Sequence, residues 1–232
     1  KAMRSQTWCT DVQLPANRFA YWRDEIFHHF SIDLSCRDRQ LKERKSFFGQ
    51  LKTHELGPLL FTNSIVSACE ISRSERAVAL DKKTCYQLTL IHSGHVKASQ
   101  RNLTWELSAG ELILLDYNAP YTLSMPMQGQ LFSVLIPGAD LERRTGKLRD
   151  LLVEPAAHKL DAKSLAAEFL KMLPPQLDRA SPQIESRIAE HVTDIVATTL
   201  LSSAEQVRGR RSTGLSSVLQ RAFQLIEAEL GN

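Results

Sequence analysis

The segment from Phe47 to Pro137 most constrains the fold, because it consists of short strand-like runs divided by glycine- and proline-containing turns. Runs of this length at such spacing are typical of antiparallel strands in a double-sheet or barrel architecture. The predicted strands are residues 50–56, 61–71, 86–92, 95–100, 103–107, 111–116, 121–125 and 131–136. We therefore expect a small β-barrel, which buries one interior and can leave a cavity within it.

Helical periodicity flanks this segment on both sides. From Leu14 to Phe30 the apolar residues recur at three- and four-residue steps, which predicts an N-terminal amphipathic helix. The same spacing after the strands predicts helices over residues 141–151, 165–173 and 182–201. The predicted fold class is therefore α+β.

The chain divides into four expected units. Residues 1–137 hold the N-terminal helix and the barrel, and residues 138–206 hold a helical region. Residues 207–214 contain three arginines and two glycines, which is typical of an exposed linker. Residues 215–232 predict one further amphipathic helix with nothing after it to cover its apolar face. We expect this helix to open a partner domain that the sequence does not contain.

The charge balance, the hydropathy and the cysteines argue against a nucleic-acid-binding domain, a membrane protein and a disulfide-rich secreted protein. The chain has 29 Lys and Arg against 26 Asp and Glu, far from the basic excess of a domain that tracks nucleic-acid phosphates. No apolar run approaches the roughly 20 residues that cross a bilayer, and no signal-peptide stretch follows the first residues. The four cysteines form no CxxC pair. We expect a cytoplasmic protein with no membrane partner and no disulfide framework.

Four motifs carry a family resemblance: CYQLTLIHSG at residues 85–94, LSAGELILLD at 107–116, NAPY at 118–121 and LIP at 135–137. In this order they resemble the effector domain of AraC/XylS-type transcription regulators, particularly the branch that responds to aromatic acids, amines and nitriles. The resemblance extends over most of the chain. It implies a cupin-like β-barrel that binds a small effector, followed by helices that build a homodimer.

The same resemblance bears on DNA binding. In that family the linker is followed by a helix like residues 216–230, which opens a domain with two helix-turn-helix motifs. Sequence-specific recognition needs side chains in the major groove, and neither reading helix lies within this sequence. DNA is therefore an expected partner only through that absent C-terminal domain.

Large side chains of the predicted strands suggest a ligand pocket. Tyr86, Leu88, Leu90 and His92 share one face of a strand by the period of two. Aromatic residues and methionine with a few polar groups suit a small, largely apolar ligand, and ordinary core packing is the alternative for each residue. The predicted ligand-binding residues are Tyr86, Leu88, His92, Trp105, Tyr121 and Met125.

Metal catalysis is the main alternative, because cupin-like barrels often bind a metal through histidines and a carboxylate. His92 and His95 are three residues apart across a predicted turn, which points them in different directions, and no further strand supplies a third histidine. The sequence also has no nucleophile elbow, phosphate loop or dinucleotide fingerprint. We predict no catalytic residue, no metal and no cofactor.

The last long helix offers a candidate dimer seam. Ile184, Ile188, Val192 and Ile195 recur at coiled-coil-like intervals, with Val196 beside them. One flank of this wide apolar face could cover the barrel while the other meets a partner, and the alternative is that the seam lies entirely on its own barrel.

Together these features predict a transcriptional regulator, of the activator kind, that binds a small organic effector, dimerises and controls DNA binding by a C-terminal domain. The alternatives are a cupin-type metal-dependent enzyme and a dimerisation module without a ligand.

Overall fold

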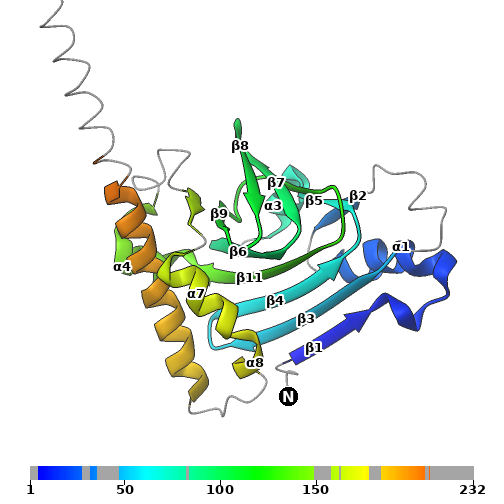
Figure 1. The fold of residues 1–232 in the computed structure, drawn as a ribbon, viewed down its shortest axis with the longest axis horizontal. Helices are drawn as coiled ribbons and strands as arrows, with labels where there is room; N and C mark the ends of the chain where they lie inside the picture. Colours follow the sequence, from blue (N-terminus) through cyan, green and yellow to red (C-terminus); the bar gives the residue numbers. More distant parts are fainter. Residues whose placement is uncertain are drawn as a thin grey trace, which may run out of the picture.

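The computed structural model describes residues 5–27, 32–35, 47–81, 84–148, 158–161, 163–177, 184–206 and 209. These residues form two antiparallel sheets with helices against them (Figure 1). The expected linker 207–214, apart from Gly209, and the expected helix 215–232 lie outside the described residues, as does part of the helix expected over 141–151.

The larger sheet has seven strands in the order β1-β3-β4-β11-β6-β9-β12. In that order they are β1 (Ser5–Cys9), β3 (Gly49–Leu56), β4 (Leu59–Val66), β11 (Gly129–Pro137), β6 (Cys85–Ser93), β9 (Leu112–Asp116) and β12 (Lys159–Leu160). The smaller sheet has the order β2-β5-β10-β7-β8. Its strands are β2 (Asp33–Ser35), β5 (Cys69–Arg73), β10 (Tyr121–Met125), β7 (His95–Gln100) and β8 (Leu103–Ser108).

The helical segments lie before, between and after the strands. Their bounds are η1 (Thr10–Val12), η2 (Pro15–Asn17), α1 (Arg18–Tyr21), η3 (Trp22–Phe27), α3 (Glu75–Leu80), α4 (Gly138–Thr145), α7 (Leu165–Met172) and α8 (Pro174–Leu177). Residues 184–206 form one further, long helix. The N-terminal helix expected from the periodicity is therefore a succession of short segments, and its last turns, η3, are a π-helix.

The two sheets correct the expectation of a closed barrel. Among the described residues the strand pairing leaves β1 and β12 at the edges of one sheet and β2 and β8 at the edges of the other. The run expected as one strand over 61–71 is divided at Ser67 and Ala68, so that β4 belongs to the large sheet and β5 to the small one. Alternation along a strand reports which residues are buried but not which strands pair, so the sequence pattern left the closure undetermined.

The central strands of the large sheet are buried on both faces. One face meets the small sheet, and the other is covered by α7, α8 and the helix of residues 184–206 (Figure 1). Strand β9 shows the consequence, because all four residues of its Leu112–Leu115 run are 0% exposed. A strand covered on both sides has no solvent face, which explains why this run is continuously apolar rather than alternating.

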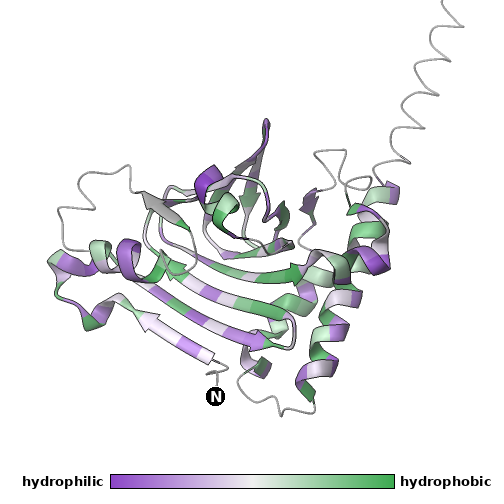
Figure 2. Cartoon of the chain, turned by 180° about the vertical axis from the view of Figure 1, so that it is seen from behind, coloured by the Kyte–Doolittle hydropathy of each residue, from purple (hydrophilic) through white to green (hydrophobic). Residues whose placement is uncertain are grey.

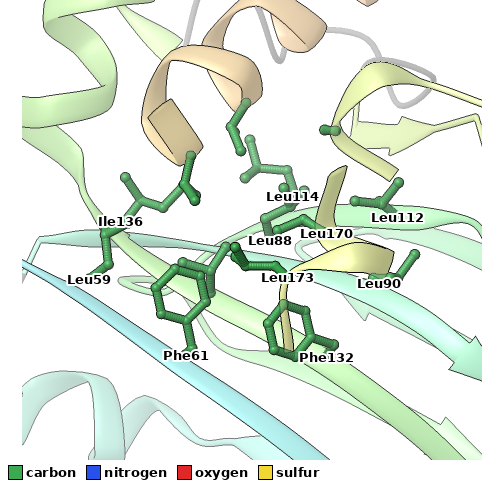
Figure 3. Close-up of a cluster of buried hydrophobic side chains, with 14 of the residues drawn as sticks. Leu59, Phe61, Leu88, Leu90, Leu112, Leu114, Phe132, Ile136, Leu170 and Leu173 are labelled. Carbon is green, nitrogen blue, oxygen red and sulfur yellow. The ribbon is translucent and has the colours of Figure 1, made fainter. Parts of the chain in front are cut away.

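The helix-facing cluster joins the sheet to the C-terminal helices. Side chains from four strands meet Leu170 of α7 and Leu173, the residue after α7, in this layer (Figure 3). Hydrophobic and hydrophilic residues alternate in bands along the helix of residues 184–206 (Figure 2), and its buried residues in the cluster are Ala189, Val192, Val196, Ala197 and Leu200. Thr199 of this helix also accepts a hydrogen bond from the backbone N–H of Ala166, at 3.3 Å, and so satisfies a donor at the first turn of α7.

Candidate functional site

A cavity of about 70 Å³ lies between the two sheets. Strands β3, β4, β6 and β11 of the large sheet form one wall, and β5 and β10 of the small sheet form the opposite wall. The lining residues are Phe27, Ile32, Leu51, Leu60, Thr62, Ser64, Ile71, Gln87, Tyr117, Tyr121, Leu123, Leu131, Ser133 and Leu135. The cavity is therefore mostly apolar, with a few hydroxyl and amide groups.

A row of hydroxyl side chains crosses the cavity-facing side of the large sheet. Thr62 of β4 is directly opposite Ser133 of β11, and Ser133 is directly opposite Thr89 of β6. Residues opposite one another in adjacent strands present their side chains on the same face. The Thr89 and Ser133 hydroxyls are 2.9 Å apart and share one hydrogen bond.

A buried hydrogen bond connects the two sheets across the cavity. The Tyr121 hydroxyl, on the small sheet, donates to Gln87 Oε1 on the large sheet at 2.9 Å. The Gln87 amide then donates to Thr89 Oγ1 at 3.0 Å, which joins this bond to the hydroxyl row. Burial raises the pKa of the Tyr121 phenol well above its ordinary value, so the hydroxyl stays protonated and acts as the donor.

Tyr117 lines the cavity with Tyr121, and Arg73 contacts the Tyr117 ring. The Arg73 side chain is 1% exposed, donates from Nε to the Tyr117 carbonyl at 2.8 Å and forms an ion pair with Asp81 at 3.1 Å. Its guanidinium carbon lies 3.8 Å from the centre of the Tyr117 ring, a cation–π contact. Burial raises the pKa of Tyr117, and the charge of Arg73 opposes that shift. Arg73 therefore contacts the Tyr117 ring while Asp81 balances its charge.

The N-terminal segment supplies the remaining wall through Phe27 and Ile32. It is held to the large sheet by Trp22, which is fully buried with its ring 5.4 Å from the Phe27 ring and 6.4 Å from the Phe47 ring. Gly49 makes this contact possible, because a Cβ at that position would lie 2.6 Å from the indole. The position of the N-terminal wall therefore depends on one aromatic residue seated over one glycine.

The six residues predicted to bind a ligand occupy different places. Tyr121 lies on the cavity wall. Tyr86 and Leu88 do share a face of β6, as expected, but that face contacts the helices and not the cavity. The reason is that β6 is covered on both sides, so a shared face can belong to either layer. His92 is exposed, Met125 is buried, and Trp105 is buried with its ring 5.1 Å from that of His158.

Gln87 and Ser133 are the site residues that sequence reasoning missed. A signal for them is present in the alternation of β6, where the polar Gln87 and Thr89 are interleaved with Leu88 and Leu90. In a strand buried on both faces, hydrogen-bonding side chains at every second position indicate the face that borders a cavity, because buried polar groups need partners.

The predicted dimer residues are divided by the packing of the last helix. Val192 is fully buried in the helix-facing cluster of its own chain, whereas Ile184 is 52% exposed. Ile188 and Ile195 are partly buried at the margin of that cluster. His191 is exposed and lies between them in the sequence, so Ile184, Ile188, His191 and Ile195 follow the four-three-four spacing of a coiled-coil seam.

Two further findings concern metals and membranes. Within the described ranges, no cluster of three or more His, Cys, Asp or Glu side chains is close enough to bind a metal ion. The helices of that same part of the chain are each too short or too polar to span a bilayer.

Removing the Tyr121 hydroxyl is expected to destabilise the chain. In Tyr121→Phe the Gln87 Oε1 atom loses its buried donor, and an unsatisfied buried polar group costs about 1–3 kcal/mol of unfolding free energy. Chemical denaturation measures this difference. Tyr21→Phe is the matched control, because the Tyr21 hydroxyl has no hydrogen-bond partner among the described residues. An equal loss in both variants would contradict a structural role for the cross-sheet bond.

Comparison with known proteins gives two kinds of result. The model of a family described as the AraC-binding-like domain matches residues 22–201. The crystal structure of the AraC-like transcriptional activator CuxR is similar, with a TM-score of 0.71 and 18% identity over 84% of this chain and 69% of that chain. At this identity the similarity shows the fold alone.

Other similarities are partial. The crystal structure of AerE from Microcystis aeruginosa has a TM-score of 0.32 and 14% identity over 38% of this chain and 40% of that chain. A score this low carries no functional argument. No curated protein matches the chain.

Proposed function

This chain belongs to the AraC-binding-like domain family, and we propose that it is the effector-sensing and dimerising part of a transcription activator. The observation that carries the proposal is the cavity between the sheets, which is apolar apart from a few aligned hydrogen-bonding groups. This combination is typical of small-molecule sites, where apolar contact gives affinity and a few polar groups fix the orientation. A cupin-like arrangement of the two sheets agrees with the AraC-like structural neighbour.

The size of the cavity bears on how an effector enters. At about 70 Å³ it is smaller than the roughly 300–1,000 Å³ of typical ligand sites. An effector larger than a few heavy atoms therefore displaces part of the wall. Phe27 and Ile32 belong to the N-terminal segment rather than to the sheet strands that form most of the lining, so we infer that this segment moves when the effector binds.

The large sheet offers a route from the effector to the helices. Strands β6 and β11 each present one side to the cavity and the other to the helix-facing cluster, as Gln87 and Leu88 illustrate. Displacement of these strands by a ligand changes the packing of α7 and of the helix of residues 184–206. A ligand that prefers one of two arrangements shifts their populations, and we propose that DNA binding by a separate domain follows that shift.

A thermal-shift screen of small organic molecules tests the proposal. A ligand that binds only the folded chain stabilises it by about 2.7 kcal/mol when the free ligand concentration is about 100 times the Kd. In a chain of this size, that corresponds to a rise in Tm of about 5–10 °C. Ser133→Val, which fills part of the cavity, should abolish the shift. His92→Ala, at an exposed position, should leave it unchanged. A shift that persists in Ser133→Val would place the ligand elsewhere and contradict the proposal.

A further inference from the structure

Among the described residues, the cavity lining has no charged side chain. Of the fourteen described lining residues, eight are leucine, isoleucine or phenylalanine. The other six are one threonine, two serines, one glutamine and two tyrosines, all neutral near pH 7. Because burial raises the pKa of both Tyr117 and Tyr121, neither phenol ionises under ordinary conditions. Any ligand in this space therefore meets dipoles and apolar surface.

Arg73, which contacts the lining residue Tyr117, is already paired with an acid. Its guanidinium stacks on the Tyr117 ring, donates to the Tyr117 carbonyl and is paired with Asp81. A carboxylate ligand in the cavity would lose its hydration and gain no charged partner within the wall. An ion placed in such a site pays a large desolvation cost, which makes binding of a charged ligand unfavourable.

The hydrogen-bond inventory of the wall shows unused donors. Gln87 has two amide hydrogens, and one of them donates to Thr89. The Thr89 and Ser133 hydroxyls share one hydrogen bond, so one of their two protons is left over. The Thr62 and Ser64 hydroxyls have no hydrogen-bond partner among the described residues. The large-sheet wall thus offers several neutral donors close together, and a ligand with an acceptor atom satisfies them.

From these observations we propose that the effector is an uncharged organic molecule with a hydrogen-bond acceptor, such as a carbonyl or ether oxygen, facing Gln87, Ser133 and Thr62. Its remaining surface is apolar and contacts Leu123 and Ile71 of the small sheet. This inference rests on the proposed function, because it names the chemistry of the ligand for the same cavity. It excludes organic acids and amines in their ionised forms.

Two sets of isosteric probes test the charge preference. Benzamide, benzoate and benzamidinium share one shape but are neutral, negative and positive, and isobutyramide, isobutyrate and isobutyramidinium form a smaller set. Each is titrated into the whole chain by calorimetry or amide NMR. We expect the amide in at least one set to bind at least about 100-fold more tightly than either ion of that set, because only the ions lose hydration without compensation.

Variants of the wall separate this proposal from the proposed function. Gln87→Leu should weaken amide binding at least about 10-fold, whereas His92→Ala should not change it. Gln87→Met provides a second, differently shaped replacement if the leucine variant does not fold. A carboxylate or amidinium that binds as tightly as the amide, through the same cavity, overturns the neutral-ligand proposal and leaves the effector site intact. Binding of no probe, or binding that Ser133→Val does not affect, overturns both.

Discussion

Replacing Trp22 with alanine is expected to lower the free energy of unfolding by about 3–5 kcal/mol, because it empties a fully buried aromatic site. In a chain of this size the Tm should fall by on the order of 10 °C. The indole contacts the rings of Phe27 and Phe47 and lies over Gly49, so the cavity left behind opens between the N-terminal segment and the large sheet. Differential scanning calorimetry measures the change.

Three related variants isolate the cause. Trp22→Phe should cost less than Trp22→Ala, because it keeps an aromatic ring and the indole N–H has no hydrogen-bond partner among the described residues. Gly49→Ala should destabilise the chain by about 1–3 kcal/mol, since its Cβ meets the indole, and Trp22→Phe should reduce that cost. Val12→Ala, at a position 72% exposed in the same segment, should stay within about 0.5 kcal/mol of the parent chain.

The Trp22 variants also bear on the effector. Trp22 holds η3 against the sheet, and η3 ends at Phe27 on the cavity wall. Loss of the anchor therefore loosens a wall of the cavity, and effector affinity should fall in Trp22→Ala even at temperatures where the chain is folded. A Trp22→Ala chain with unchanged Tm would show that the N-terminal segment does not depend on this contact.

Much of the fold followed from local patterns, but the assignment of strands to sheets did not. Eight strand-like runs between Phe47 and Pro137 were recognised because turns interrupt them, and β3, β6 and β10 begin and end close to the expected positions. Strands β1, β2 and β12 were not predicted. They are short edge strands that depend on pairing with distant partners, such as Trp8 opposite Leu51, and not on a pattern of their own.

The face of β6 that borders the cavity could not be chosen from the sequence alone. Its period of two correctly grouped Tyr86 with Leu88, and it equally grouped Gln87 with Thr89. The predicted pocket used the apolar group of this strand, although the period of two alone does not say which group borders a cavity. In the structure the C-terminal helices cover the apolar group, so the more polar group borders the cavity. The presence of that second layer is a long-range property that no single strand encodes.

The packing of the last helix also changes which residues are available to the proposed dimer interface. Val192 faces its own sheet, so it is not available to a partner in this arrangement. The exposed line through Ile184 and His191, flanked by the partly buried Ile188 and Ile195, remains apolar enough to form a seam. Asp194, on the neighbouring exposed side of the helix, forms an ion pair with Arg144 of α4. That side of the helix therefore already contacts its own chain.

Placing charges on this seam should therefore separate the dimer. In the double variant Ile184→Glu with His191→Glu, both changed side chains are exposed in the single chain, so its folding should be preserved. At a two-fold interface the seam of one copy faces the seam of the other, so the introduced glutamates of both copies come close together. Like charges brought together cost several kcal/mol, which raises the dimer Kd at least about 100-fold. Sedimentation of the variant should show a folded monomer at concentrations where the parent chain is dimeric.

Two control variants separate an effect on the dimer interface from an effect on folding. Glu190→Gln changes an exposed side chain outside the seam and should leave the dimer intact, whereas Val192→Glu buries a charge against the sheet and should unfold the chain whether or not it dimerises. A double glutamate variant that stays dimeric would remove this helix from the interface. A parent chain that is monomeric with and without effector would refute dimerisation itself, because the seam would then have no partner to lose.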